Sequence, residues 1–361
     1  MERCGPMESL FPMLFAPRPI CRSVSCFRWN RRKEAHLNDT YKSEDFRGKR
    51  LRTAGFIGAF LAFGLCSYAQ TNPSADRSAD PNTIRVNVRL VNVFTTVTDS
   101  KGRVISDLTK DDFKLFEDDI PQTISVFDRE SDLPLNIALA IDTSESTRND
   151  MKLEVASAKK FVHSIMRPVD QASIFQISED VLQLTKFTND IKKVDRGIDD
   201  LQKGGGTSLY DAIYLASESL ADRQGRKVMV LITDGGDTTS SATYSSSVRR
   251  AQEAEAIVYS IIIVPVAADA GRNTGGEHAL IQMSRDTGGK YYYAESTNQL
   301  DDAFRQISDE LRTQYLLAYY PNRRVANSSF RRIKVEVNQN DSLGNPLEAR
   351  HRAGYYTTAV K

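Results

Sequence analysis

The chain has 361 residues, of which 40% are hydrophobic and 26% are charged, and its formal net charge is +1. This composition is typical of a soluble globular protein that is long enough for two domains, or for one large domain with appendages. Residues 1–53 contain 12 Lys and Arg against 6 Asp and Glu, which leaves the rest of the chain at about −5 and excludes a basic nucleic-acid-binding stripe there.

The positive excess precedes a short apolar stretch, residues 54–66, which has thirteen residues and no charge. A membrane-spanning helix needs about 20 residues, so this stretch is too short to cross a bilayer. The basic flank, the apolar core and the small-x-small sequence Ser67-Tyr68-Ala69 have the layout of a secretory signal that is cut after Ala69. Residues 1–69 are therefore predicted to be a basic tail and signal peptide. The alternative is that the segment is uncleaved and anchors the protein in a membrane.

All four cysteines precede the predicted cleavage, at positions 4, 21, 26 and 66. The exported chain would contain none, and we expect no disulfides and no thiol chemistry in it. A lipoprotein signal at Cys66 is disfavoured because Leu65 stands where that signal requires a small residue. A secretory signal is seldom preceded by about fifty residues of mixed composition. We therefore expect the start codon to be misassigned, with Val24 or Leu51 as alternative first residues.

A small β segment is predicted at residues 84–130, after a polar linker at residues 70–83. Apolar and polar residues alternate from Ile84, and the strand is expected to continue to Val97. Further strands are expected at residues 114–117 and 123–127. A segment of this size is too thin to be stable alone, so we expect it to pack against another part of the chain.

Residues 131–312 show strands alternating with helical patterns, which predicts an α/β fold with a doubly wound, mostly parallel sheet flanked by helices. The expected strands are 137–141, 172–177, 181–187, 227–233, 257–264 and 291–293, of which the second and third form a hairpin-like edge. The expected helices are 152–165, 194–201, 209–220, 244–256, 279–287 and 300–311. A mobile loop is expected at residues 265–277.

The final segment, residues 313–361, returns to the alternation of a β structure. Strands are expected at residues 314–320, 332–337 and 354–357, with turns between them. We expect this segment to pair with the strands of residues 84–130, so that the two ends form one β module beside the α/β core.

The predicted strand at residues 137–141 is followed by a carboxylate and two hydroxyls, Asp142, Ser144 and Ser146. Ligand groups in open α/β sheets lie just past the carboxyl ends of the strands, so these side chains are expected in one loop at the rim of the sheet. Carboxylate and hydroxyl oxygens are hard donors that suit an ion such as magnesium.

Two later features complete a recognisable pattern. Thr207 follows the glycine run 204–206, and the predicted strand 227–233 ends in Asp234-Gly235. Together, D-x-S-x-S, the threonine after a glycine turn and T-D-G resemble the metal-ion-dependent adhesion site of von Willebrand factor type A domains. All five motif positions are filled, by Asp142, Ser144, Ser146, Thr207 and Asp234. The order of segments, with QYLLAYYP and AGYY in the tail, resembles exported bacterial proteins that carry a type A-related domain.

The resemblance implies a divalent metal, most simply Mg²⁺, with Mn²⁺ or Ca²⁺ as alternatives. Ser144 and Ser146 would be direct ligands, Thr207 a direct or water-mediated ligand, and Asp142 and Asp234 would hold the water ligands. An open coordination position would then accept a carboxylate from a protein partner, aided by the positive end of the helix after Thr207.

Three other carboxylates lie near these motifs. Asp211 is interpreted as a helix cap. Asp180 and Asp237 are interpreted as solvated loop charges, and the alternative is that they are auxiliary metal ligands.

The sequence therefore predicts an exported, metal-dependent protein-binding or adhesion module that is not an enzyme and binds no nucleic acid. The three histidines after the signal, His163, His278 and His351, are not placed to form a catalytic group with the metal loops. Two alternatives remain open. One is a structural scaffold of the cell envelope with a non-functional or purely structural metal site. The other is a type A partner of an ATPase in assembly, which the export signal disfavours.

Overall fold

The computed structural model describes residues 90–129, 132–144, 151–264, 274–322 and 329–357, and the side chains of residues 151–153 are not described. The predicted signal peptide, the linker, the start of the first predicted strand and Ser146 lie outside these ranges. Every helix in these ranges is too short or too polar to span a lipid bilayer.

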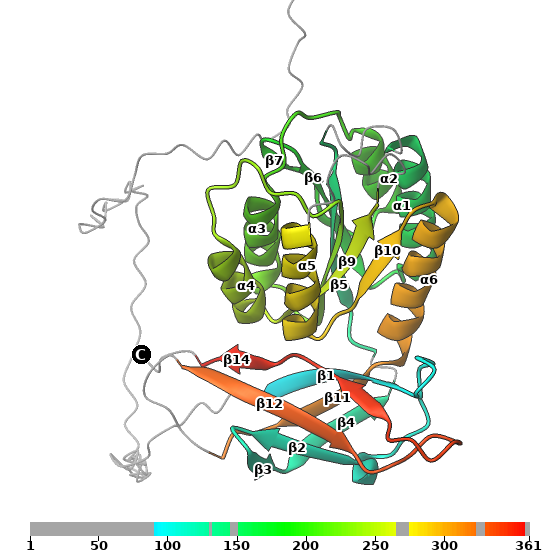
Figure 1. Ribbon diagram of the computed structural model, residues 1–361, viewed down its shortest axis with the longest axis vertical. Helices are drawn as coiled ribbons and strands as arrows, with labels where there is room; N and C mark the ends of the chain where they lie inside the picture. Colours follow the sequence, from blue (N-terminus) through cyan, green and yellow to red (C-terminus); the bar gives the residue numbers. More distant parts are fainter. Residues whose placement is uncertain (1–89, 130–131, 145–150, 265–273, 323–328, 358–361) are drawn as a thin grey trace, which may run out of the picture. The chain divides into compact units, whose positions relative to one another are not determined.

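A six-stranded sheet forms the centre of the α/β part (Figure 1), in the order β10-β9-β8-β5-β6-β7. Its strands are β5 (Leu135–Asp142), β6 (Gln171–Ile177), β7 (Val181–Thr188), β8 (Arg226–Thr233), β9 (Ala256–Ile263) and β10 (Tyr291–Ala294). Every neighbouring pair is parallel except β6 and β7, which are antiparallel. The predicted doubly wound, mostly parallel sheet with a hairpin at one edge is confirmed.

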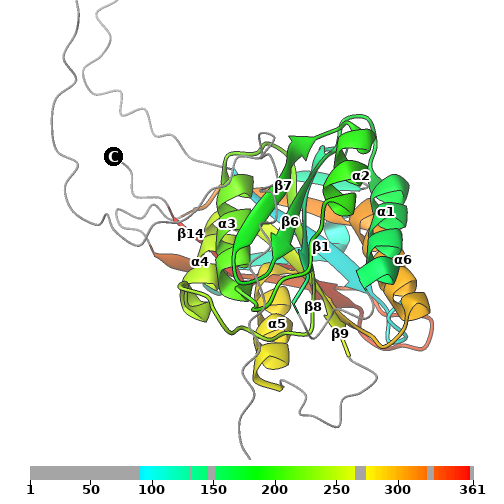
Figure 2. The same cartoon turned by 90° about the horizontal axis from the view of Figure 1, so that it is seen from above.

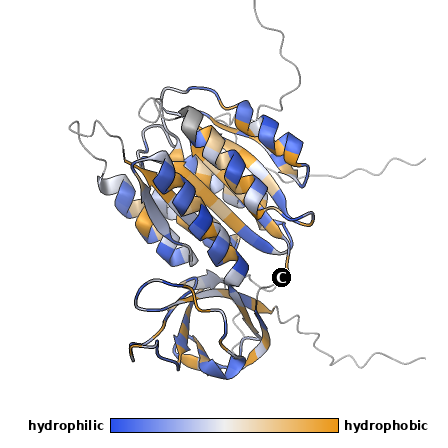
Figure 3. Ribbon diagram, turned by 90° about the vertical axis from the view of Figure 1, so that its right-hand side faces the viewer, coloured by the Kyte–Doolittle hydropathy of each residue, from blue (hydrophilic) through white to orange (hydrophobic). Residues whose placement is uncertain are grey.

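Helices cover both faces of this sheet, as the view from above shows (Figure 2). They are α1 (Met151–Ile165), α2 (Ile191–Asp199), α3 (Leu209–Ala221), α4 (Tyr244–Glu253), α5 (Thr274–Thr287) and α6 (Thr297–Thr313). Helices α1, α2 and α6 pack on one face, and α3, α4 and α5 pack on the other. The strands between the two layers of helices are mostly hydrophobic, and the outer surfaces of the helices are hydrophilic (Figure 3).

Strand β5 shows why the central strands read as unbroken apolar runs. Successive side chains point to opposite faces, and both faces are covered by helices. Ile137 and Leu139 therefore pack in the cluster with α1, α2 and α6, while Ala138 and Ala140 pack in the cluster with α3, α4 and α5. All four side chains are fully buried.

The remaining strands form two four-stranded sheets, in the orders β13-β1-β11-β4 and β14-β12-β2-β3. From the first segment come β1 (Val91–Thr98), β2 (Phe113–Glu117), β3 (Ile120–Gln122) and β4 (Ile124–Arg129). From the last segment come β11 (Tyr315–Tyr319), β12 (Phe330–Val337), β13 (Glu348–Arg350) and β14 (Gly354–Tyr356). Strand β11 lies between β1 and β4, and β12 pairs with β2, so the two ends of the chain interleave into one β module, as expected.

One buried cluster lies between these two sheets and includes Val93, Leu115, Leu317 and Val335. Each sheet on its own would expose an apolar face, and their packing gives the module a core of its own. The polar part of this core centres on Glu117, which is 3% exposed and accepts hydrogen bonds from the phenols of Tyr319 (2.7 Å) and Tyr355 (2.9 Å).

The start of helix α5 differs from the sequence-based expectation. Helix α5 begins at Thr274, so the end of the loop expected at 265–277 is helical. Glycines weaken a helical pattern, and the early start went unnoticed because the first turn contains Gly275 and Gly276. The structure uses Gly276 for a close approach, since a Cβ there would lie 1.6 Å from the carbonyl oxygen of Gly235.

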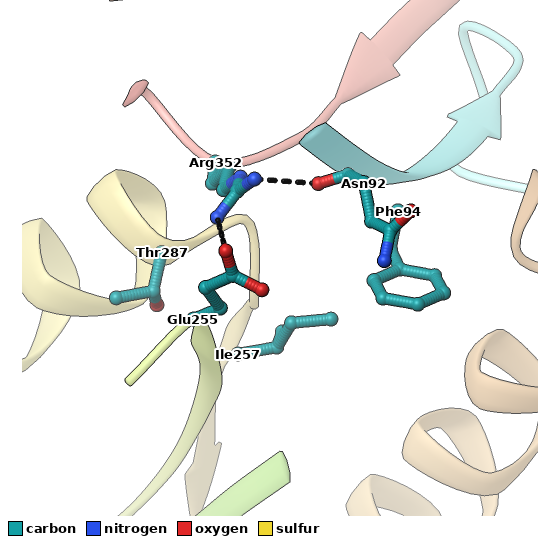
Figure 4. Close-up of a pocket in the computed structure, with 6 residues that line it drawn as sticks. All are labelled: Asn92, Phe94, Glu255, Ile257, Thr287 and Arg352. Carbon is teal, nitrogen blue, oxygen red and sulfur yellow. Dashed lines mark hydrogen bonds and ion pairs between the residues drawn. The ribbon is translucent and has the colours of Figure 1, made fainter. Parts of the chain in front are cut away.

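The segment at residues 350–353 fastens the β module to the α/β part. Arg350 Nη2 forms an ion pair with Glu310 Oε2 of α6 at 2.6 Å, and Glu310 is 3% exposed. Arg352 donates to the carbonyl oxygen of Asn92 (2.6 Å) and forms an ion pair with Glu255 at 3.6 Å (Figure 4). The seam between the two parts therefore contains buried charges that are paired across it.

Truncation of one of these charges tests the seam. Glu310→Ala leaves the Arg350 cation at a largely buried position without its carboxylate, and we expect a loss of about 3–5 kcal/mol in the free energy of unfolding. Urea denaturation measures the change. Asp309→Ala, at an exposed position of the same helix, is the matched control and should change stability by less than about 0.5 kcal/mol. Equal effects in the two variants would contradict the role of the ion pair.

The seam also predicts a pH dependence through His351. Burial lowers the pKa of His351 below the ordinary value of 6.5, and its Nε2 accepts a hydrogen bond from the Val335 amide at 3.1 Å. The unfolded chain therefore binds the proton more readily, so stability is complete above about pH 6.5 and falls as the pH drops towards the folded-state pKa. Urea denaturation at pH 7.5 and pH 5 should show this loss. His351→Gln should remove most of this pH dependence of stability, whereas His163→Gln should keep it. The same pH dependence in wild type and in both variants would contradict the role of His351.

Candidate functional site

The carboxyl ends of β5, β6 and β8 meet at one edge of the sheet. Strand β5 lies between the other two and is parallel to both, with Asp142 opposite Ile177 and Ile141 opposite Ile232. The residues that follow β6 and β8 therefore flank Asp142 on its two sides. The first and third sequence motifs therefore lie at the same rim of the sheet.

Asp142 is the buried centre of this rim and is 1% exposed. Its Oδ2 accepts a hydrogen bond from Thr233 Oγ1 at 2.7 Å, and its Oδ1 accepts one from the Ser144 amide at 2.9 Å. Burial, together with the charge of Asp234, raises the pKa of Asp142 to about 6. A nearby cation would stabilise the ionised form of such a carboxyl group and lower its pKa.

Ser144 lies directly beside this carboxylate and is 3% exposed. The hydrogen bond from its amide to Asp142 closes a short turn that keeps the serine at the rim. Ser146, the second serine of the motif, lies outside the described residues.

The glycine loop before α3 brings Thr207 to the same rim. The Gly204 amide donates to the carbonyl oxygen of Thr143 at 2.9 Å, which ties the loop to the end of β5. On the other side, the Thr207 amide donates to Thr238 Oγ1 at 2.9 Å, and the Thr238 amide donates to the Thr207 carbonyl oxygen at 2.8 Å. Thr207 is 4% exposed and is therefore held between the loops that follow β5 and β8.

Asp234 is half-buried and follows β8. Its Oδ1 accepts a hydrogen bond from the Gly236 amide at 3.1 Å. The next residue, Gly235, has φ of +87°, a conformation that side chains other than glycine rarely adopt. The glycine of T-D-G is thus required both by this turn and by the close approach of Gly276.

The amino end of α3 differs from the expectation. The Tyr210 amide donates to Asp237 Oδ1 at 3.3 Å, and the Asp211 amide donates to Ser240 Oγ at 3.1 Å. These first-turn donors are therefore satisfied by the loop after β8. Asp237 is half-buried and not simply solvated.

Asp211 also acts differently from the predicted cap. Its two carboxylate oxygens accept hydrogen bonds from the amides of Ser241 (3.0 Å) and Ala242 (2.7 Å). Asp211 therefore fastens the loop that follows β8 and does not cap its own helix.

The donors at this rim are oxygens. Asp142 and Asp234 supply carboxylates, and Ser144 and Thr207 supply hydroxyls. Such a set fits a hard cation such as Mg²⁺ and not a soft one. Among the residues that the structure describes, no group of three or more His, Cys, Asp or Glu side chains is placed to hold a metal ion. An ion at this rim would therefore depend on the hydroxyls and on water.

Two residues of the site were missed by sequence reasoning. Thr233 donates to Asp142, although it stands inside the T-D-G motif. Glu179 follows β6 and accepts hydrogen bonds from the glycine loop. The available signal was the polar run Ser178-Glu179-Asp180 directly after a buried strand, at the edge where ligand groups gather.

The comparisons with known proteins include a family match within the α/β part. Residues 137–236 match the family model described as von Willebrand factor type A domain. A comparison with curated proteins finds no match.

Solved structures similar to the chain include the conserved hypothetical protein BatB from Bacteroides thetaiotaomicron, with 17% identity, a TM-score of 0.40, and coverage of 49% of this chain and 97% of that chain. They also include the vWF domain of the type V pili tip protein Mfa5 from Porphyromonas gingivalis, with 14% identity, a TM-score of 0.41, and coverage of 49% and 94%. The PilB minor pilin from Streptococcus sanguinis has 14% identity and a TM-score of 0.41, and the match covers 50% of this chain and 62% of that chain.

The matched residues span β5 to β8 and contain four motif positions that the structure describes, Asp142, Ser144, Thr207 and Asp234. The doubly wound sheet was predicted from the alternation of strands with helical patterns, and the resemblance was identified from the motif residues. Within the matched residues 137–236, the α/β part of this chain is similar to von Willebrand factor type A domains.

Proposed function

We propose that this type A domain binds a divalent cation, Mg²⁺ in the first instance, at the rim around Asp142, and that it recognises a carboxylate of a protein partner through this ion. The observation that carries the proposal is the burial of Asp142 beside Asp234 among hydroxyl groups. A cation close to the buried carboxylate of Asp142 would stabilise its ionised form. The donor chemistry of the rim supports a hard ion.

Each residue has a defined part in this proposal. Ser144 and Ser146 coordinate the ion through neutral hydroxyls, and Thr207 coordinates it directly or through water. Asp142 and Asp234 hold its water ligands. Because few negative charges contact the ion directly, it keeps enough positive charge to attract an acidic side chain at an open position.

The same proposal places the protein outside the cytoplasm, in the periplasm, at the cell surface or beyond it, where it acts in adhesion or protein binding. The signal-like residues 54–69 support this location. A binding role without catalysis is supported by the positions of two histidines. His163 on α1 lies within 3.0 Å of Asp195, and His351 lies in the seam with the β module.

Fluorescence anisotropy with a labelled glutamate-rich peptide tests the proposal. The full chain should bind the peptide in the presence of Mg²⁺ and release it when EDTA is added. A glutamine-matched peptide should not bind, because it cannot supply a carboxylate. Ser144→Ala should weaken the magnesium-dependent signal while leaving the melting temperature nearly unchanged. Binding that is equal with and without Mg²⁺ would refute the proposal.

A further inference from the structure

The loop after β6 contacts the glycine loop that carries Thr207. Glu179 Oε2 accepts a hydrogen bond from the Gly205 amide at 2.7 Å and a second one from the Gly206 amide at 3.2 Å. One carboxylate oxygen therefore binds two consecutive amides directly before Thr207. Consecutive backbone N–H groups of this kind form a concave anion site, and here the anion is supplied by the chain itself.

The two loops are joined at further points. The Ser208 amide donates to the carbonyl oxygen of Ser178 at 2.8 Å, and Ser208 Oγ donates to the carbonyl oxygen of Glu179 at 2.8 Å. Gly204 leaves no space for a side chain, because a Cβ there would lie 2.3 Å from the Cβ of Ser178. Residues on both sides of Gly205 and Gly206 are thus held by backbone and packing contacts, whereas these two glycines are held by Glu179.

Glycine runs have more backbone freedom to lose than other sequences, and a fixed loop conformation must overcome this entropy. Hydrogen bonds to an ionised acceptor are shorter and stronger than those between neutral groups. Backbone hydrogen bonds hold the pKa of Glu179 below its usual value, and the largest contribution comes from the Gly205 amide. The Gly206 amide contributes in the same direction. The carboxylate is therefore in the charged form that binds these amides best.

We infer that Glu179 is a positioning residue for the metal site, which orders Gly205 and Gly206 and thereby sets the place of the Thr207 hydroxyl. The inference rests on the proposed function, because it concerns the ion that this hydroxyl would coordinate. Glu179 acts through the loop and is not itself assigned as a ligand. Its neighbour Asp180 has the same charge and a similar exposure, and it provides a matched comparison.

Three variants of the full chain separate positioning from charge. Glu179→Ala removes the acceptor and should weaken Mg²⁺ binding about 10- to 100-fold, the range found when groups that orient metal ligands are removed. Glu179→Gln keeps an oxygen acceptor and should restore most of the affinity. Asp180→Ala removes an equal charge nearby and should change the affinity by less than about threefold. Calorimetric titration with MgCl₂ measures all three.

A second readout does not depend on the ion. Hydrogen exchange of the Gly205 and Gly206 amides, followed by NMR in the metal-free protein, should be faster in Glu179→Ala than in wild type and Asp180→Ala. The melting temperatures should agree within about 2 °C, since the contact lies at the surface.

The outcomes are distinguishable. Saturable Mg²⁺ binding in wild type with equal affinity in Glu179→Ala would overturn the inference and leave the proposed function standing. Equal weakening by Glu179→Ala and Asp180→Ala would also overturn it, because charge alone would then explain the effect. Unchanged exchange of both glycine amides would overturn the loop contact itself. No Mg²⁺ binding in wild type would refute the proposed function and the inference with it.

Discussion

Asp142→Ala is expected to abolish the stabilisation of the fold by magnesium. A ligand that binds only the folded state stabilises it, by about 2.7 kcal/mol at 100 times its dissociation constant. Wild type should therefore melt at a higher temperature as Mg²⁺ is added, and the variant should not. Differential scanning calorimetry of the full chain with MgCl₂ and with EDTA measures this difference.

The metal-free comparison is also informative. The pKa of Asp142 is raised from 3.8 to about 6, so at pH 7 its charge opposes folding by about 3 kcal/mol. Alanine removes this charge and also the hydrogen bonds with Thr233 and Ser144, and these effects offset each other. We therefore expect metal-free Asp142→Ala to melt within a few degrees of metal-free wild type. Asp180→Ala is the control and should keep the magnesium effect. The same shift with Mg²⁺ in Asp142→Ala as in wild type would contradict the site.

Leu139→Ala and Leu231→Ala are each expected to lower the free energy of unfolding by about 2–5 kcal/mol. Both side chains are fully buried in the middle of a central strand. Leu139 packs in the cluster with α1, α2 and α6, and Leu231 packs in the cluster with α3, α4 and α5, so the pair tests both layers. The loss arises from the missing methyl groups and from the cavity that remains.

Urea denaturation provides the measurement for both variants. Leu215→Ala is the control, because this side chain lies on α3 and is 36% exposed. We expect a clearly smaller loss in the free energy of unfolding for Leu215→Ala, because folding buries less apolar surface at this position. Losses as small as that of Leu215→Ala in both core variants would show that the core is misplaced.

The central strands could be predicted from sequence because a parallel strand covered on both faces must be apolar along its whole length. Strands β5 and β8 were therefore found with boundaries close to those observed. The short strands β3 and β13 were not found. Strand β3 has three residues and follows a turn at Asp118-Asp119, where both residues have positive φ without the usual glycine or asparagine. Such short strands carry too little alternation to be recognised.

The site could be predicted where it depends on strand ends. Asp142 and Asp234 follow apolar runs, and the parallel arrangement brings them to one edge without knowledge of any side-chain contact. Glu179 could not be assigned, because its role depends on β6 lying beside β5 and on the path of a glycine loop 26 residues later. The hydrogen bond from the first turn of α3 to Asp237 could not be predicted either, because Asp237 lies 27 positions later in the sequence than Tyr210.

The most direct test of the account is a calorimetric titration of Mg²⁺ and then Mn²⁺ into the full chain, alone and with the glutamate-rich peptide. We predict saturable binding of one ion per chain, which becomes tighter with the peptide and is lost in Asp142→Ala. No saturable binding of either ion, with or without the peptide, would contradict the central claim that this domain binds its partner through a metal ion.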